Sequence, residues 1–215
     1  VSGVSDAVTV SSGNSHSCVK TQTAELLCWG QNDFGQLGDG TFEDRDLATK
    51  VDSLSGVVEV SAGDRHTCAR TRTSSVTPGH SQVFCWGSNE LYATGPSAQM
   101  LYEPTPVEYP GLVDSVEIGS GWHSNCVLKP NGEVLCWGNN REGTLGDGST
   151  TSTSTLRQVI GLTDAESITV GGGHACAIRT SKDVVCWGMN MSGQLGNDVR
   201  VFSDSPVPVA GLSDA

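Results

Sequence analysis

The sequence predicts an all-β protein built from four repeats of about 50 residues, and three observations carry this prediction. A segment that begins with cysteine and ends with Cys-Trp-Gly recurs four times along the 215 residues. The composition, with 27 glycines, 17% charged residues and 6% aromatic residues, fits short strands joined by turns better than packed helices. No run of about ten or more residues shows helical periodicity.

Each recurring segment is typical of a β-hairpin. In Cys18–Gly30 (CVKTQTAELLCWG), an apolar-polar alternation, a polar turn and a second alternation follow the first cysteine. The other copies are Cys68–Gly87, Cys126–Gly138 and Cys176–Gly188. We therefore expect two paired strands from this segment in every repeat.

The remainder of each repeat supplies further strands. An alternating segment such as Val4–Val10 precedes the hairpin and indicates a strand that ends at a glycine turn. A glycine-rich connector, residues 32–40 in the first copy, follows Cys-Trp-Gly, and we expect its Leu37 in the core. A Pro-Val segment, clearest at 105–107, indicates an edge strand, where proline is tolerated.

Three to four strands with one tryptophan in each repeat are typical of a β-propeller blade. The sequence leaves open whether the blades form a closed ring or a partial arc of a larger propeller. We treat residues 1–215 as a single repeat domain. Its units cover approximately 4–53, 54–111, 112–161 and 162–211, and 212–215 begin a further unit.

The eight cysteines form four regularly placed pairs, which is typical of an oxidising compartment. A zinc site is the alternative, since His16, His66 and His174 each lie two positions before a cysteine. The third repeat has Ser124 in that place and no fourth ligand recurs, so we predict no metal and no cofactor. Cysteines at these spacings can lie opposite each other across a hairpin. We predict four disulfides: Cys18 with Cys28, Cys68 with Cys85, Cys126 with Cys136, and Cys176 with Cys186.

The histidines and tryptophans recur with the repeat, and recurrence favours a structural role. Catalysis would need one histidine paired with one nucleophile or carboxylate. No phosphate-binding loop, nucleophile elbow or carboxylate pair is present, so the sequence predicts that the chain is not an enzyme. The tryptophans that follow the second cysteines are expected to pack between blades: Trp29, Trp86, Trp137 and Trp187.

The chain is acidic, with a net charge of −12 from 12 Lys and Arg against 24 Asp and Glu. Such a surface repels phosphate, so we expect no nucleic-acid partner. No apolar stretch approaches the roughly 20 residues of a membrane span, so we expect no membrane insertion. With the paired cysteines, these features predict an extracellular or cell-surface location, and we expect a processed or trimmed product because the chain starts at Val1.

The motif Gly-x-x-His-x-Cys, then Cys-Trp-Gly-x-Asn, then Gly-Gln-Leu-Gly-Asp-Gly resembles the regulator of chromosome condensation repeat. The resemblance covers all four units. It implies a propeller, usually of seven blades, whose loops bind proteins; the founding member acts on a small GTPase, and a bacterial relative inhibits β-lactamases. This chain has four units, and its cysteine pairs resemble those of secreted, cysteine-containing bacterial-type members. The cysteines argue against an intracellular GTPase partner.

The second repeat departs most from the pattern. Its hairpin turn is enlarged at 73–82, its connector changes at 91–96, and all three tyrosines of the chain lie in it. Tyrosine and tryptophan on loops are frequent anchors of protein interfaces. We therefore predict a partner-binding cluster made of Tyr92, Met100, Tyr102 and, in the next turn, Trp122.

Together these features predict a secreted or cell-surface binding scaffold whose propeller loops contact a protein partner. Two alternatives stay open. A self-assembling structural protein, forming a surface or a filament, would use the repeated units and open ends to bind further copies. An inhibitor of an extracellular enzyme is implied by the family resemblance alone.

Overall fold

A computed structural model describes residues 4–72, 81–96 and 98–212, so most of the enlarged turn predicted at 73–82 lies outside the described residues. Sixteen strands in the described part form four antiparallel sheets of four consecutive strands each. A short 3-10 helix, η1 (Glu90–Tyr92), is the one helix found there, and nothing helical in the described part has the length and apolar character for a bilayer span.

The four sheets have the same strand order. The first contains β1 (Ala7–Ser12), β2 (His16–Thr21), β3 (Leu26–Gly30) and β4 (Arg45–Lys50). The second contains β5 (Val57–Ala62), β6 (His66–Arg72), β7 (Ser81–Ser88) and β8 (Tyr102–Glu108). The third contains β9 (Glu117–Ser120), β10 (Ser124–Leu128), β11 (Val134–Gly138) and β12 (Thr153–Gln158). The fourth contains β13 (Ala165–Val170), β14 (His174–Arg179), β15 (Val184–Gly188) and β16 (Ser203–Pro208).

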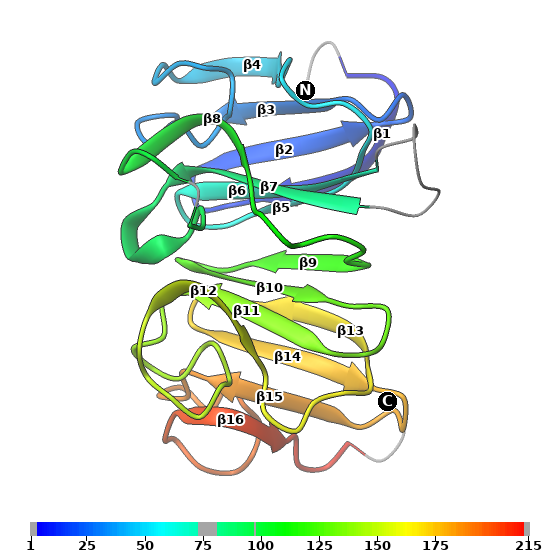
Figure 1. Cartoon of the computed structure of the whole chain (residues 1–215), viewed down its shortest axis with the longest axis vertical. Coiled ribbons are helices and arrows are strands. Elements are labelled where there is room, and N and C mark those ends of the chain that lie inside the picture. Colours follow the sequence, from blue (N-terminus) through cyan, green and yellow to red (C-terminus); the bar gives the residue numbers. More distant parts are fainter. Residues whose placement is uncertain (1–3, 73–80, 97, 213–215) are drawn as a thin grey trace.

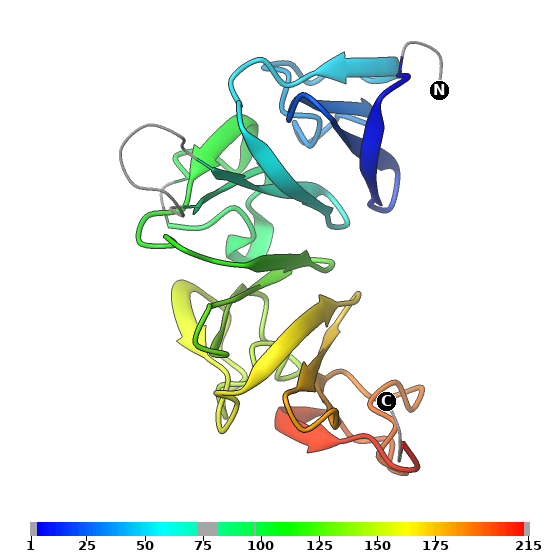
Figure 2. The ribbon, with the colours of Figure 1, turned by 90° about the vertical axis from the view of Figure 1, so that its right-hand side faces the viewer.

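The sheets are the blades of a propeller arc. The first strands of neighbouring sheets contact one another, β1 with β5, β5 with β9 and β9 with β13. Figure 2 shows the blades following one another along an open arc, with the first and fourth blades at its two ends. The predicted all-β propeller fold is confirmed, and of the two arrangements left open by the sequence the structure has the partial arc.

The second and third strands of each blade form the predicted hairpin, and a disulfide joins them at its centre. The paired cysteines lie directly opposite each other, with Cα atoms 4.0–4.1 Å apart. This spacing is close to that of a non-hydrogen-bonded antiparallel pair. The bridges are Cys18–Cys28, Cys68–Cys85, Cys126–Cys136 and Cys176–Cys186. These bridges use all eight cysteines, so no cysteine thiolate remains to bind zinc in the alternative zinc site.

The glycine of Cys-Trp-Gly is required by the backbone. Gly30 has φ +105°, and a Cβ there would lie 2.5 Å from the Ser15 carbonyl oxygen. The strand pairing shifts between Cys28 and Gly30, so a bulge turns the chain into the connector. Gly87, Gly138 and Gly188 repeat this geometry.

Three apolar cores lie between the four blades. Each contains a tryptophan of the later blade, and Leu37 and Leu145 of the connectors are buried in the first and third cores as predicted. In the second connector Thr94 takes the place of this leucine. Tyr109, at the position held elsewhere by Val51 and Val159, fills the space and packs against Trp137 with ring centroids 4.7 Å apart. Tyr109, which was not part of the predicted partner-binding cluster, is therefore a core residue.

Candidate protein-interaction face

Two of the three recurring histidines, His16 and His66, join neighbouring blades. His16 Nε2 lies 2.8 Å from Thr67 Oγ1 of the second blade, and that hydroxyl donates to the Gln36 carbonyl at 2.8 Å. Because the single hydroxyl proton of Thr67 goes to Gln36, we assign the proton between His16 and Thr67 to the imidazole. A directed chain of hydrogen bonds therefore links the first blade, the second blade and the first connector.

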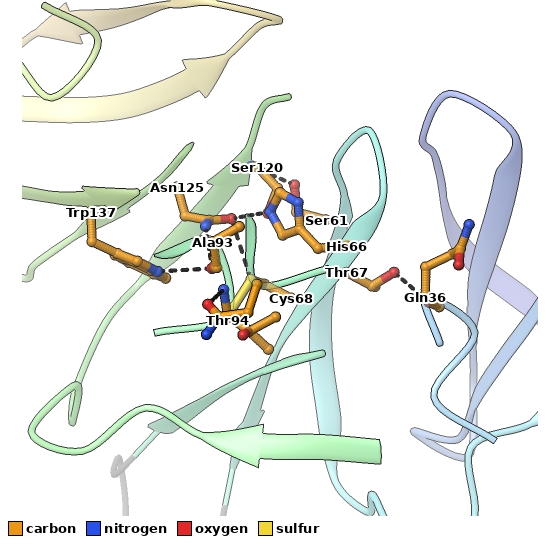
Figure 3. Close-up of a disulfide and its surroundings, with 12 residues drawn as sticks. Gln36, Ser61, His66, Thr67, Cys68, Ala93, Thr94, Ser120, Asn125 and Trp137 are labelled. Atoms are coloured by element: carbon orange, nitrogen blue, oxygen red, sulfur yellow. Dashed lines mark hydrogen bonds between the residues drawn. A yellow bond between two sulfur atoms is a disulfide. The ribbon is translucent and has the colours of Figure 1, made fainter. Parts of the chain in front are cut away.

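The second and third blades repeat this link with different groups. His66 Nε2 lies 2.8 Å from Asn125 Oδ1, and Asn125 Nδ2 donates to the Ala93 carbonyl at 2.8 Å. Figure 3 shows both side chains beside the Cys68 sulfur, with Trp137 donating to the same Ala93 carbonyl at 3.0 Å. The amide oxygen of Asn125 can only accept, so His66 also carries its proton on Nε2.

Burial keeps both imidazoles neutral. Burial, together with a smaller effect of the nearby His66, lowers the pKa of His16 to about 4. Burial likewise lowers the pKa of His66 to about 4, although its bond to Asn125 acts in the opposite direction. In both rings the buried Nδ1 has no hydrogen-bond partner, so a second proton would be an unpaired buried charge. These groups are shielded from solvent and act as structural links.

The third interface between blades lacks this link. Ser124 replaces the histidine, and Ala175 replaces the threonine or asparagine that would receive its proton. Because both partners of the hydrogen bond are replaced together, neither replacement leaves the other partner buried without a hydrogen bond. The tryptophan bond is kept, since Trp187 Nε1 donates to the Thr144 carbonyl at 2.9 Å. The recurring tryptophans therefore pack between blades as predicted, except for Trp29, which is only half-buried at the open end of the first blade.

The exposed apolar residues gather on one face of the arc. We define the connector face as the turns between the first and second strands of each blade together with the connectors between the third and fourth strands. The connectors lie along the left-hand side of Figure 1. More than half of the large apolar side chains described as exposed belong to this face: Phe42, Tyr92, Met100, Leu101, Trp122, Met191, Val199, Val201 and Phe202.

Tyr102 is half-buried and is held by residues that the sequence analysis missed. Its ring makes an edge contact with Phe34 of the first connector, with centroids 5.2 Å apart. The Arg65 guanidinium lies 4.7 Å from the centre of the Phe34 ring and 3.7 Å from the Glu90 carboxylate. This group joins the first and second blades, and a cation over an aromatic face near an exposed loop is a common interface element.

Tyr92 and Met100 are more exposed, at 48% and 52%, and both belong to the second connector. Tyr92 lies in the left-handed region with φ 68°, which is uncommon for a residue with a large side chain. The buried carboxylate of Glu103 accepts a hydrogen bond from the Met100 backbone at 2.8 Å, and Asn89 donates to the Leu101 carbonyl at 2.7 Å. The fold therefore fixes the loop that presents these side chains.

Trp122 lies on the same face but in a different part of it. It is 52% exposed on the turn between β9 and β10, beside Gly172 of the fourth blade. The turns of all four blades meet here around a pocket of about 320 Å³, lined among others by Asn14, Asp64, Trp122 and Gly172. The structure thus brings the four predicted residues onto one face, with Tyr102 at a junction of blades and Trp122 at the axis of the arc.

The sequence of the blades that carry this face matches the models of a known repeat family. A model described as "Regulator of chromosome condensation (RCC1) repeat" matches residues 24–70 and 131–178. A second model of the same description matches residues 7–36, 57–92, 116–144 and 165–194, one segment in each blade. The chain belongs to the RCC1 repeat family. The four segments matched by the second model each contain one copy of Cys-Trp-Gly.

Relatives of this RCC1-repeat chain include the ultraviolet-B receptor UVR8 of Arabidopsis thaliana, 30% identical over 144 residues. The human RCC1 domain-containing protein 1 is 30% identical over 150 residues. The alignments cover 66% and 70% of this chain but only 31% and 35% of the two relatives. The chain therefore spans about a third of the length of these relatives.

Solved structures show the same fold. The Prp20p structure from Saccharomyces cerevisiae has a TM-score of 0.80 at 23% identity, over 97% of this chain and 51% of that one. Human WBSCR16 has a TM-score of 0.83 at 22% identity, over 94% and 52%. Prp20p is described with binding to Gsp1p and histones, which are proteins. The relatives named here are plant, human and yeast proteins, and the expected likeness to secreted bacterial members finds no support among them.

Proposed function

We propose that this chain is a non-catalytic scaffold whose connector face binds a protein partner outside the reducing cytosol, in a secreted or cell-surface protein. The observation that carries the proposal is the gathering of exposed aromatic and apolar side chains on that face. Exposed apolar patches on a folded protein mark interaction surfaces, and Tyr, Trp and Met are enriched in them.

The rigidity of the face supports this proposal. Tyr102 is packed on Phe34, and the backbone around Met100 is tied to Glu103. Side chains that are already ordered lose less conformational entropy on binding, so more of the contact energy appears as affinity. The disulfides below the face add to the rigidity of each blade, because they join its two central strands.

The disulfides also support the proposed location outside the reducing cytosol. Disulfides persist in oxidising surroundings, whereas cysteines are kept as reduced thiols in the cytosol of most organisms. All eight cysteines are bridged, and each bridge joins strands of one blade. The net charge of −12 supports a protein as the partner over a nucleic acid, because phosphate would be repelled.

Affinity capture from the culture medium and surface extract of the source organism tests the proposal. Three baits are compared. The first is the wild-type chain, the second is a connector-face variant with Tyr92→Ser, Met100→Ser and Trp122→Ser, and the third is a control with Val113→Ser and Val116→Ser. The control residues are also exposed, at 43% and 46%, but lie on the opposite face, in the link between the second and third blades.

The proposal expects one protein that the wild type and the control both capture and the connector-face variant loses. Because the substituted side chains of both variants are exposed, neither substitution set should unfold the chain, and circular dichroism checks this. Equal capture by all three baits would show that the partner binds elsewhere.

A further inference from the structure

The turns between the first and second strands of the blades meet at the pocket of about 320 Å³, which we call the axial pocket. Each turn has a glycine followed by a residue that differs in every blade, and these residues line the pocket: Asn14, Asp64, Trp122 and Gly172. A Cβ at Gly63 would lie 2.4 Å from the Gly121 carbonyl oxygen, and one at Gly121 would lie 2.1 Å from that of Gly171. The glycines therefore let neighbouring turns touch through their backbones, while the side chain at the next position varies.

Backbone contacts hold the turns of the two middle blades in place. The Asp64 N–H donates to the Gly121 carbonyl at 3.1 Å, and the Trp122 N–H donates to the Gly172 carbonyl at 3.2 Å. A Cβ at Gly172 would lie 2.6 Å from the Trp122 indole, so the ring lies where any other residue would carry its side chain. The indole is thereby positioned, and Trp122 is still 52% exposed. A positioned and exposed indole can bind a cation with little loss of its own conformational entropy.

Asp64 supplies the charge of the axial pocket. The lining residues all belong to the described part of the chain, and none of the others is charged. The Arg65 guanidinium lies 3.4 Å from the Asp64 carboxylate and 3.7 Å from that of Glu90, so one cation is shared by two carboxylates. Burial holds the pKa of His123, which follows Trp122, below its usual value, so this imidazole is neutral at pH 7. These four groups together carry one net negative charge.

The lining also contains neutral hydrogen-bond acceptors. Ser120 is 7% exposed, and its hydroxyl has no hydrogen-bond partner among the residues that the structure describes. Asn14 adds an amide oxygen. An arginine or lysine side chain carries several N–H donors and a positive charge, which suit these acceptors and Asp64. An anion would be repelled by Asp64, and an apolar group would desolvate its carboxylate without pairing it.

We propose that the axial pocket binds an arginine or lysine side chain of the protein partner, with the cation held by the Asp64 carboxylate and the Trp122 indole. The inference rests on the proposed function for the source of this side chain, and it adds the charge that the partner carries at its point of contact. The net charge of −12 supports a basic contact, because an acidic chain attracts a basic surface as the two proteins approach.

Titration of the chain with N-acetyl-arginine amide and with N-acetyl-lysine amide tests the pocket, followed by NMR signals of the Trp122 indole N–H and the Gly172 amide. N-acetyl-citrulline amide is the neutral comparison, because it has the shape of the arginine probe without its charge. The variants Asp64→Asn and Trp122→Asn each install the side chain that Asn14 has at the equivalent position, so the turns should keep their shape. Asp198→Asn is the matched control, since it removes the same charge from an exposed residue of the fourth connector, at φ 62°, which asparagine tolerates.

Both basic probes should shift the two signals in the wild type and in the control, and the citrulline probe should shift neither. Asp64→Asn and Trp122→Asn should each weaken the binding of the basic probes by about fivefold, measured at the Gly172 amide. Shifts by neither basic probe, equal shifts by the citrulline probe, or unchanged binding by Asp64→Asn would each overturn the basic site. The titration needs no partner, so a partner that is captured through the connector face while no basic probe binds would leave the proposed function standing and remove this inference alone.

Discussion

Lowering the pH should destabilise the arc through the two buried histidines that link its blades. In the unfolded chain a histidine has a pKa of about 6.5, whereas burial lowers the pKa of His16 and of His66 to about 4. The unfolded chain therefore binds protons more readily between these values. The stability that neutral histidines contribute is complete above about pH 6.5 and is lost as the pH falls towards 4.

The size of the effect follows from the two pKa values. At pH 5 each buried histidine lowers the free energy of unfolding by about 2 kcal/mol relative to pH 7.5, on the order of 4 kcal/mol for the pair. The variant His66→Ser with Asn125→Ala isolates one of them, because it installs the residues that the third interface already uses, Ser124 and Ala175.

Urea unfolding followed by circular dichroism, at pH 7.5 and at pH 5, measures the effect. The wild type should lose about 2 kcal/mol more between the two pH values than the variant with His66→Ser and Asn125→Ala. The carboxylates titrate in both proteins, so the difference between the proteins reports His66. If both proteins lose the same amount, the histidine link does not couple the blades in the way described.

Three further changes test the packing between blades. Trp86→Phe should cost about 1–2 kcal/mol because it removes the bond to a buried carbonyl, while Trp29→Phe at the open end should cost much less; urea midpoints of both variants compare them. Tyr109→Val should cost about 2–4 kcal/mol by leaving a cavity, and adding Thr94→Leu should recover most of it, as a double-mutant cycle would show. Reducing all four disulfides should lower the stability by about 3 kcal/mol for each hairpin loop, seen as a shift of the urea midpoint with and without reductant.

The hairpins were predictable because several local signals agree in them. Cysteine spacing, strand alternation and the glycine after tryptophan all indicate the same pairing of Cys18 with Cys28, and the structure shows why Gly30 is needed there. Leu37 was predictable as a core residue because it is the single leucine of an otherwise mostly polar connector.

The contacts between blades were harder to predict because they join residues about 50 positions apart. An alignment of the four repeats contains a signal that could have predicted these contacts between blades. Where Ser124 replaces the histidine, Ala175 replaces the polar residue of the next blade, so the two positions change together. The same alignment places Tyr109 over Val51, which would have predicted a buried tyrosine.

The exposed face could be predicted only in part. Departure of the second repeat from the pattern indicated Tyr92, Met100 and Tyr102. The role of Phe34 and Arg65 in holding Tyr102 could not be predicted, because it depends on how the first connector packs against the second blade.

Hydrogen exchange of the chain with and without its captured partner measures where the partner lies. A partner on the connector face should slow exchange in η1, in the backbone around Met100 and in the turn that carries Trp122, while the link around Val113 on the opposite side stays unchanged. Protection confined to the link around Val113, with no change near Trp122 or Met100, would contradict a binding site on the connector face.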